Sequence, residues 1–325
     1  MTAGASGGVD PVIAGNGAQR LSWLEIPPHI RAGLEERFGS SVVDAVSQPG
    51  GFSPGFASRL TLTDGRRVFV KAVSGAQNRE SPAIYRQEAR YAAALPAEVP
   101  APRLLWTFDD DDWVALAFED IEGRPPSLPW QPDELGRVLE AIAALPAALT
   151  PPPFEAPTLG DAFARAFSGW RRLATKERER AVELDPWAQA NLDRLAELEV
   201  TWQAGAGGGT LLHSDLRADN ILLTSERVYI VDWPWVRTGP AWADLLFMLP
   251  SVAMQGGGDP EEIFVTHAIA KDAPREAANA MLAGLTGYFL RSALQPAPPG
   301  LPALRLFQKA QGDAALAWLR RRLGW

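Results

Sequence analysis

The chain has 325 residues, of which 46% are hydrophobic and 22% charged, the mixture of a globular protein large enough for two lobes. Its net charge of −8 argues against nucleic acid or an anionic membrane surface as the main partner, because both attract an excess of Lys and Arg. The absence of cysteine excludes disulfides and thiolate metal sites, and three histidines do not easily build a His-rich centre, so a bound metal needs oxygen ligands.

The first twenty residues are rich in Gly and Ala. They lack both the basic start and the apolar core of a signal peptide, so we expect residues 1–20 to form a disordered tail. The best candidate for a membrane segment, residues 245–254, is too short and is interrupted by Pro250. We therefore expect a cytoplasmic protein.

Residues 21–119 carry the patterns of a small lobe. Helical spacing over residues 21–38 comes first, and strand patterns follow, with a hairpin signal at Asp64-Gly65. The expected strands cover residues 42–46, 58–63, 67–73, 103–108 and 113–118. A helix is expected over residues 81–95. This order predicts a small antiparallel sheet with one main helix.

Residues 120–325 are predicted to form a larger, mostly helical lobe. The expected helices cover residues 133–149, 159–180, 186–198, 260–294 and 302–323. The exception is an apolar hairpin over residues 221–231, with Thr224-Ser225 at its turn. The chain is therefore predicted to be an α+β protein with two lobes that meet near residues 119–123.

A lysine and a glutamate in the first lobe are predicted to pair. Lys71 lies inside an apolar strand, where an ammonium group needs a partner unless it lies along an exposed edge. In the following helix, Glu88 falls on the same stripe as Ile84 and Tyr91, which faces the sheet. A buried carboxylate at this position also needs a partner, and Lys71 is the nearest strand cation. The alternative is an exposed glutamate on an Ala-rich helix.

The second lobe contains a run of polar residues between two apolar strands. Asp215 is followed five residues later by Asn220, and Asp232 comes twelve residues after that. Asn220 directly precedes one strand of the predicted hairpin and Asp232 directly follows the other, so we expect them at the same end. One carboxylate to take a proton and two oxygen ligands for Mg²⁺ are what phosphoryl transfer to a hydroxyl requires. His213 follows apolar residues and is expected to be a buried scaffold residue.

This run resembles the catalytic loop and metal-binding Asp of the aminoglycoside phosphotransferase family, whose members have a bilobal protein-kinase-like fold. The resemblance implies that Asp215 is the catalytic base and that Asn220 and Asp232 bind Mg²⁺. Ser214 stands where the family usually has Gly. Asp244 matches a family Asp that supports the catalytic loop, and we interpret it as structural.

The resemblance extends to the first lobe and covers residues 42–249. It implies that Lys71 and Glu88 orient the phosphates of ATP, or of GTP. It also implies that the Gly-rich run over residues 50–56, with Ser53 and Gly55, covers the phosphates. The segment with Glu119 and Ile121 resembles the hinge between lobes, where backbone atoms meet the nucleotide base.

The sequence predicts a small-molecule O-phosphotransferase, monomeric or homodimeric, that needs ATP and Mg²⁺. The alternatives are a pseudokinase scaffold and, less favoured, a protein kinase, because no Asp-Phe-Gly or activation segment follows Asp232. Trp233, Trp235 and Trp242 fit either stacking on an acceptor or core packing. From Gly205 onward acidic and basic residues are equal in number, so an aminoglycoside acceptor is not favoured over another antibiotic or secondary metabolite, an amino alcohol or a sugar.

Overall fold

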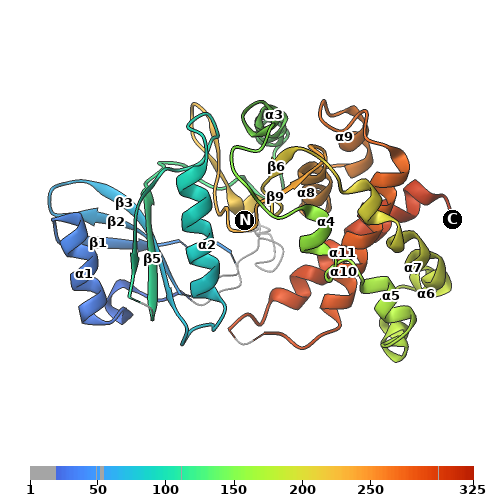
Figure 1. Cartoon of the computed structure of the whole chain (residues 1–325), viewed down its shortest axis with the longest axis horizontal. Helices are drawn as coiled ribbons and strands as arrows, with labels where there is room; N and C mark the ends of the chain where they lie inside the picture. Colours follow the sequence, from blue (N-terminus) through green and yellow to red (C-terminus); the bar gives the residue numbers. More distant parts are fainter. Residues whose placement is uncertain (1–19, 49, 52–54, 111, 299) are drawn as a thin grey trace, which may run out of the picture.

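A computed structural model describes residues 20–325 except 49, 52–54, 111 and 299. The expected disordered tail thus lies outside the described residues, apart from Arg20. Figure 1 shows a sheet flanked by two helices at one end of the molecule and a helical part at the other. The predicted α+β architecture is confirmed. None of the described helices has the length and hydrophobicity needed to cross a bilayer.

The sheet has five antiparallel strands in the order β1-β2-β3-β5-β4. The strands are β1 (Val42–Ser47), β2 (Phe56–Leu62), β3 (Arg67–Ser74), β4 (Leu104–Asp109) and β5 (Trp113–Glu119). Helix α1 (Pro28–Phe38) packs on one face and α2 (Ser81–Ala94) on the other, so the central strands are buried on both sides. The charged Lys71 of β3 therefore lies in an enclosed layer.

The second part is built around a largely buried group of helices. Its helices are α3 (Pro132–Leu149), α4 (Leu159–Phe163), α5 (Gly169–Ala174), α6 (Pro186–Ala190), α7 (Leu192–Val200), α8 (Ala243–Met254), α9 (Pro260–Thr266), α10 (Arg275–Ala293) and α11 (Leu304–Leu323). Two small two-stranded sheets complete it. Strands β7 (Ile221–Leu223) and β8 (Val228–Ile230) form the predicted hairpin, and β6 (Thr210–Leu212) pairs with β9 (Arg237–Gly239).

Three predicted helices are wrong in their extent, and the one over residues 186–198 divides into α6 and α7. The segment expected to be one helix over residues 260–294 divides into α9 and α10. Pro274 directly precedes α10 and disfavours an earlier start of that helix, because a proline disfavours helical geometry in the residue before it. The segment over residues 159–180 divides into α4, α5 and a 3-10 turn. Gly169 begins α5 and lies so close to α10 that an added Cβ would come within 2.1 Å of the Gly287 carbonyl. At the start of α5, packing between helices therefore matters more than helix propensity.

Candidate active site

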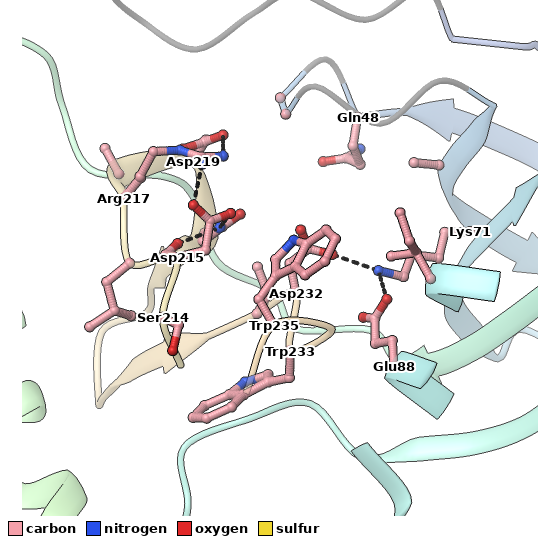
Figure 2. Close-up of a pocket in the computed structure, with 18 of the residues that line it drawn as sticks. Gln48, Lys71, Glu88, Ser214, Asp215, Arg217, Asp219, Asp232, Trp233 and Trp235 are labelled. Carbon is pink, nitrogen blue, oxygen red and sulfur yellow. Dashed lines mark hydrogen bonds and ion pairs between the residues drawn. The ribbon is translucent and has the colours of Figure 1, made fainter. Parts of the chain in front are cut away.

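A cavity of about 990 Å³ lies between the sheet and the helical part. Figure 2 shows Lys71 and Glu88 on its sheet side and Asp215 and Asp232 on its helical side. Asn220 also lines it. The cavity thus collects residues that are as many as 161 positions apart in the chain.

Lys71 joins the two sides of this cavity. Its ammonium group forms ion pairs with Glu88 of α2 and with Asp232, whose Oδ1 lies 2.7 Å from Nζ. Burial alone would lower the pKa of Lys71, but the carboxylates of Asp232 and Glu88 outweigh burial and raise it. The predicted pair of Lys71 and Glu88 is therefore present, and Lys71 also reaches the carboxylate that follows the β7–β8 hairpin.

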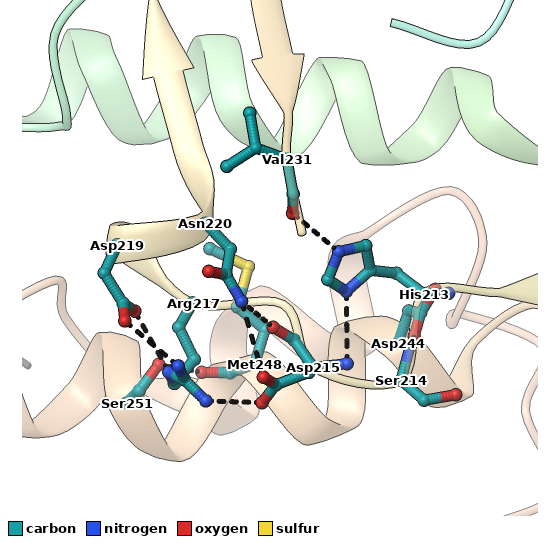
Figure 3. Close-up of polar contacts among 10 residues, drawn as sticks. All are labelled: His213, Ser214, Asp215, Arg217, Asp219, Asn220, Val231, Asp244, Met248 and Ser251. Carbon is teal, nitrogen blue, oxygen red and sulfur yellow. Dashed lines mark hydrogen bonds and ion pairs between the residues drawn. The ribbon is translucent and has the colours of Figure 1, made fainter. Parts of the chain in front are cut away.

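Asp244, in the first turn of α8, holds the loop that carries Asp215 (Figure 3). Its carboxylate accepts hydrogen bonds of 2.7 Å from the backbone N–H groups of His213 and Ser214. His213 is fully buried, and burial lowers its pKa, so the ring is neutral. Its Nε2 donates to the Val231 carbonyl and its Nδ1 accepts from the Asp215 N–H. His213 and Asp244 are thus scaffold residues, as expected.

Two residues beside the cavity have left-handed backbone angles that non-glycine residues rarely adopt. Ser214 has φ 66° and Asp232 has φ 67°. The value at Ser214 explains why a relative would carry Gly there, since Gly adopts this angle without a steric cost. Such conformations persist where the surrounding structure fixes them, and they gather at functional sites.

Asp215 presents a carboxylate to the cavity. Its side chain keeps 28% of its surface exposed, yet its position below the molecular surface raises its pKa to about 6, against the opposing effect of Arg217. Arg217 donates to Oδ1 of Asp215, and Nδ2 of Asn220 donates to the backbone carbonyl of Asp215 at 2.8 Å. A carboxylate with this pKa is ionised at neutral pH and is basic enough to take a proton.

Arg217 and Asp219 were given no role by the sequence motif. Arg217 is largely buried, and its Nε and Nη2 each donate to Asp219 at 3.0 Å while Nη1 reaches Asp215. One guanidinium therefore bridges two carboxylates. The available signal was the alternation Asp-x-Arg-x-Asp over residues 215–219, which places charges of opposite sign two residues apart.

Asn220 and Asp232 lie at the same end of the β7–β8 hairpin, as predicted, and the Val231 N–H donates to the Asn220 carbonyl at 2.9 Å. Since Nδ2 of Asn220 is used by Asp215, Oδ1 is the atom it can offer to a cation. Burial would raise the pKa of Asp232, but Lys71 outweighs burial and lowers it, so the carboxylate is ionised.

This amide and carboxylate fit Mg²⁺, which binds one or two protein oxygens and completes its shell with phosphate and water. Within the described residues no three His, Asp or Glu side chains form a metal-binding group. A metal at Asn220 and Asp232 would therefore depend on phosphate oxygens for its remaining ligands.

The segment after β5 is anchored to the sheet. Arg59 donates from Nη2 to the carbonyls of Ile121 and Gly123, at 2.8 Å each, and its Nε pairs with Asp120 at 3.1 Å. Glu119 and Ile121 both line the cavity. Their contact with a nucleotide base stays a prediction.

The Gly-rich run contributes Gly50 and Gly51 to the cavity. Gly55 has φ 113°, and an added Cβ would come within 2.6 Å of the Ala72 carbonyl, so it packs directly on β3. Gly55 is not among the described lining residues, and its predicted contact with phosphate is untested. Ser53 lies outside the described residues.

The sequence left two roles open for the three tryptophans, stacking on an acceptor or packing in the core, and their exposure differs. Trp233 and Trp242 are 2% and 7% exposed and belong to the core. Trp235 is 37% exposed and lines the cavity beyond Asp232 (Figure 2). Trp233 also lines the cavity but is buried, so Trp235 is the most exposed of the three and the one best placed to stack on a ligand.

The model of the phosphotransferase enzyme family matches residues 49–280, more than two thirds of the chain. The chain belongs to the phosphotransferase enzyme family. This match confirms the resemblance drawn from the motifs, and the matched range includes Lys71, Asp215 and Asp232.

Individual relatives of this phosphotransferase act on different acceptors. A homoserine kinase from Mesorhizobium japonicum is 36% identical over 66 residues, and the chain spans only 20% of that protein. The structure of an aminoglycoside phosphotransferase from Alicyclobacillus acidocaldarius is 16% identical with a TM-score of 0.52, over 87% of this chain and 92% of that one. An amicoumacin kinase with AMP-PNP, Ca²⁺ and Ami is 9% identical with a TM-score of 0.53, over 87% and 92%. These structures confirm the kinase-like fold.

Proposed function

We propose that this phosphotransferase moves the γ-phosphoryl group of ATP to a hydroxyl of a small molecule, with Asp215 as the base. The observation that carries the proposal is that a single cavity holds the Lys71–Glu88–Asp232 cluster and the carboxylate of Asp215. The cluster is suited to a triphosphate, and Asp215 is suited to a hydroxyl proton. The structure of an amicoumacin kinase contains AMP-PNP and Ca²⁺, which supports ATP and a divalent cation as requirements of the proposed reaction.

In the proposed reaction the hydroxyl oxygen of the acceptor attacks the γ-phosphorus. The bond from that phosphorus to the oxygen shared with the β-phosphate breaks, and ADP leaves. The hydroxyl proton passes to Asp215. Arg217 donates to Oδ1 of this carboxylate, and Nδ2 of Asn220 makes only a long contact of 3.4 Å with Oδ2, so we assign the proton to Oδ2. The products are a phosphate monoester and ADP.

The other residues of the cavity position the reactants. Lys71 is held charged by two carboxylates and would bind the phosphates of ATP. Asn220 and Asp232 would hold Mg²⁺, which neutralises charge on the β- and γ-phosphates when bound. Asp244 and His213 keep the Asp215 loop fixed, so that the base meets the acceptor without rearrangement.

A screen of hydroxyl compounds tests the proposal. The purified protein is incubated with ATP, or GTP, and Mg²⁺, and each compound is examined for a mass gain of one phosphate group. We expect one chemical class to be phosphorylated with an equal amount of ADP formed. Nucleotide binding without ADP formation across the panel would instead support the pseudokinase interpretation, and phosphate on protein substrates alone would support a protein kinase.

A further inference from the structure

The helical side of the cavity is mostly apolar and aromatic. Its aromatic lining residues come from α4, α8, α10, α11 and the segment after β8, and they include Phe163, Trp235, Phe247, Tyr288, Phe289 and Phe307. Trp235 exposes 37% of its surface, so its indole is available for stacking. A wall of this kind favours an acceptor with an apolar or aromatic body over a fully hydroxylated one.

The carboxylates on this side are already engaged. Among the described lining residues after position 122, the acidic ones are Asp215, Asp219 and Asp232. Arg217 pairs with the first two, and Lys71 pairs with Asp232. The helical wall therefore offers no unpaired carboxylate to the ammonium group of a cationic acceptor.

Arg237 differs from these paired carboxylates, because it is a cation without an ion-pair partner among the described residues. It lines the cavity, and the hydrogen bond from its side chain goes from Nη1 to the carbonyl of the neighbouring Val236. Its Nε is buried without a hydrogen-bond partner, and among the described residues no carboxylate forms an ion pair with it. Burial lowers the pKa of Arg237. A half-buried guanidinium in this state gains most from an anion that enters the cavity.

The position of Arg237 is compatible with the reacting hydroxyl at Asp215. In the β6–β9 pair Arg237 lies opposite Leu212, three residues before Asp215. Three residues span at most about 10 Å, and the left-handed backbone at Ser214 shortens that span. An acceptor of modest size can therefore place a hydroxyl at Asp215 and a second group at Arg237.

Building on the proposed function, we propose that the acceptor is an anionic hydroxyl compound with an apolar or aromatic body, whose carboxylate binds Arg237. The ring-lined wall recognises the body, and Arg237 recognises the charge. A polycationic aminoglycoside or a quaternary amino alcohol would instead bring its charge toward an unpaired guanidinium, which is unfavourable in a partly desolvated site.

A matched series of probes tests this assignment. The three probes are 4-(hydroxymethyl)benzoate, 4-(hydroxymethyl)benzamide and 4-(hydroxymethyl)benzylamine, which share a ring and a hydroxyl but are anionic, neutral and cationic. Binding to the full-length protein is followed by calorimetry, and phosphorylation by mass gain. We expect the benzoate to bind about tenfold or more tightly than the amine, since a hydrogen bond to a charged group contributes at least that factor.

The variant Arg237→Gln removes the charge and keeps most of the volume. We expect it to abolish the preference for the benzoate while the affinities for the benzamide and for ATP stay unchanged. Arg178→Gln serves as the control, because Arg178 is an exposed residue paired with Asp193 outside the cavity. Its preference should equal that of the unmodified protein.

Three results would overturn the assignment: an amine that binds as tightly as the benzoate, a preference that survives in Arg237→Gln, or a loss of ATP affinity in that variant. The last result would assign Arg237 to the nucleotide. If the benzoate preference depends on Arg237 but no compound is ever phosphorylated, the anion site stands and the phosphotransferase function fails. The binding and transfer measurements therefore separate the two proposals.

Discussion

The carboxylate of Asp215 is held in a state suited to a base that works near neutral pH. Its pKa is raised to about 6 because it lies below the surface, among other carboxylates. The proposed mechanism needs the ionised form, and the ionised fraction grows as pH rises through that pKa. We predict that kcat/KM increases with pH up to about 6 and levels off above it. A pH profile of phosphoryl transfer checks this, and a rate that is flat from pH 5 to about 8 would contradict it.

Arg217 limits how far burial raises the pKa of Asp215. Its guanidinium lies against Asp215 and lowers the pKa that burial raises. We predict that Arg217→Gln moves the acidic limb of the pH profile to higher pH, because the ionised base loses its nearest cation. The exposed Arg178→Gln is the matched control. A limb that stays in place would mean that Arg217 holds Asp219 only.

At the scale of elements, β3 and α2 are joined through a buried charge pair. The side chains of Lys71 and Glu88 are 10% and 3% exposed. Removing one partner of such a pair leaves an uncompensated charge, so Lys71→Met is predicted to lower the free energy of unfolding by about 3 kcal/mol. The double variant with Glu88→Leu should recover part of this loss. Urea unfolding measures the stability of both variants. Equal unfolding midpoints for Lys71→Met and the unmodified protein would show that the Lys71–Glu88 pair does not stabilise the fold.

Elements with a clear local pattern could be predicted from the sequence. The alternation in β2, the apolar run in β3 and the stripe that carries Glu88 on α2 are visible in single segments. Strands β6 and β9 have three residues each, too few to show a period, and they pair across 24 intervening residues, 213–236. Helix α8 is buried nearly all round and contains Pro250, so it shows no amphipathic stripe and was not predicted.

The candidate site also contains residues that could be predicted from the sequence and a feature that could not. Asp215, Asn220 and Asp232 could be found because their spacing around a hairpin fixes where they lie. The unpaired charge of Arg237 could not be predicted, because the lack of an ion-pair partner among the described residues depends on every residue that packs around the side chain. Positions are encoded by short segments, whereas burial and charge balance belong to the assembled cavity.

In the whole molecule, the sheet and the helical part meet at the segment after β8. Lys71 pairs with Asp232, and Gln87 of α2 donates to the Pro234 carbonyl at 2.6 Å. Asp232 and Trp235 lie in this segment and Arg237 directly follows it at the start of β9, and we propose that they bind the metal, the acceptor body and the acceptor charge. A change in how the two parts meet therefore affects each reactant, and function depends on the assembled cleft more than on either part.

We propose that Asp215 takes the acceptor's proton in that cleft. The most direct measurement is the rate of phosphoryl transfer by Asp215→Asn to an acceptor found in the screen, together with its affinity for ATP. We predict a rate lower by about 10² to 10⁴ with ATP affinity unchanged, because the amide keeps the shape of the carboxylate but takes no proton. The exposed Asp313→Asn should transfer normally. Near-normal transfer by Asp215→Asn would contradict the account.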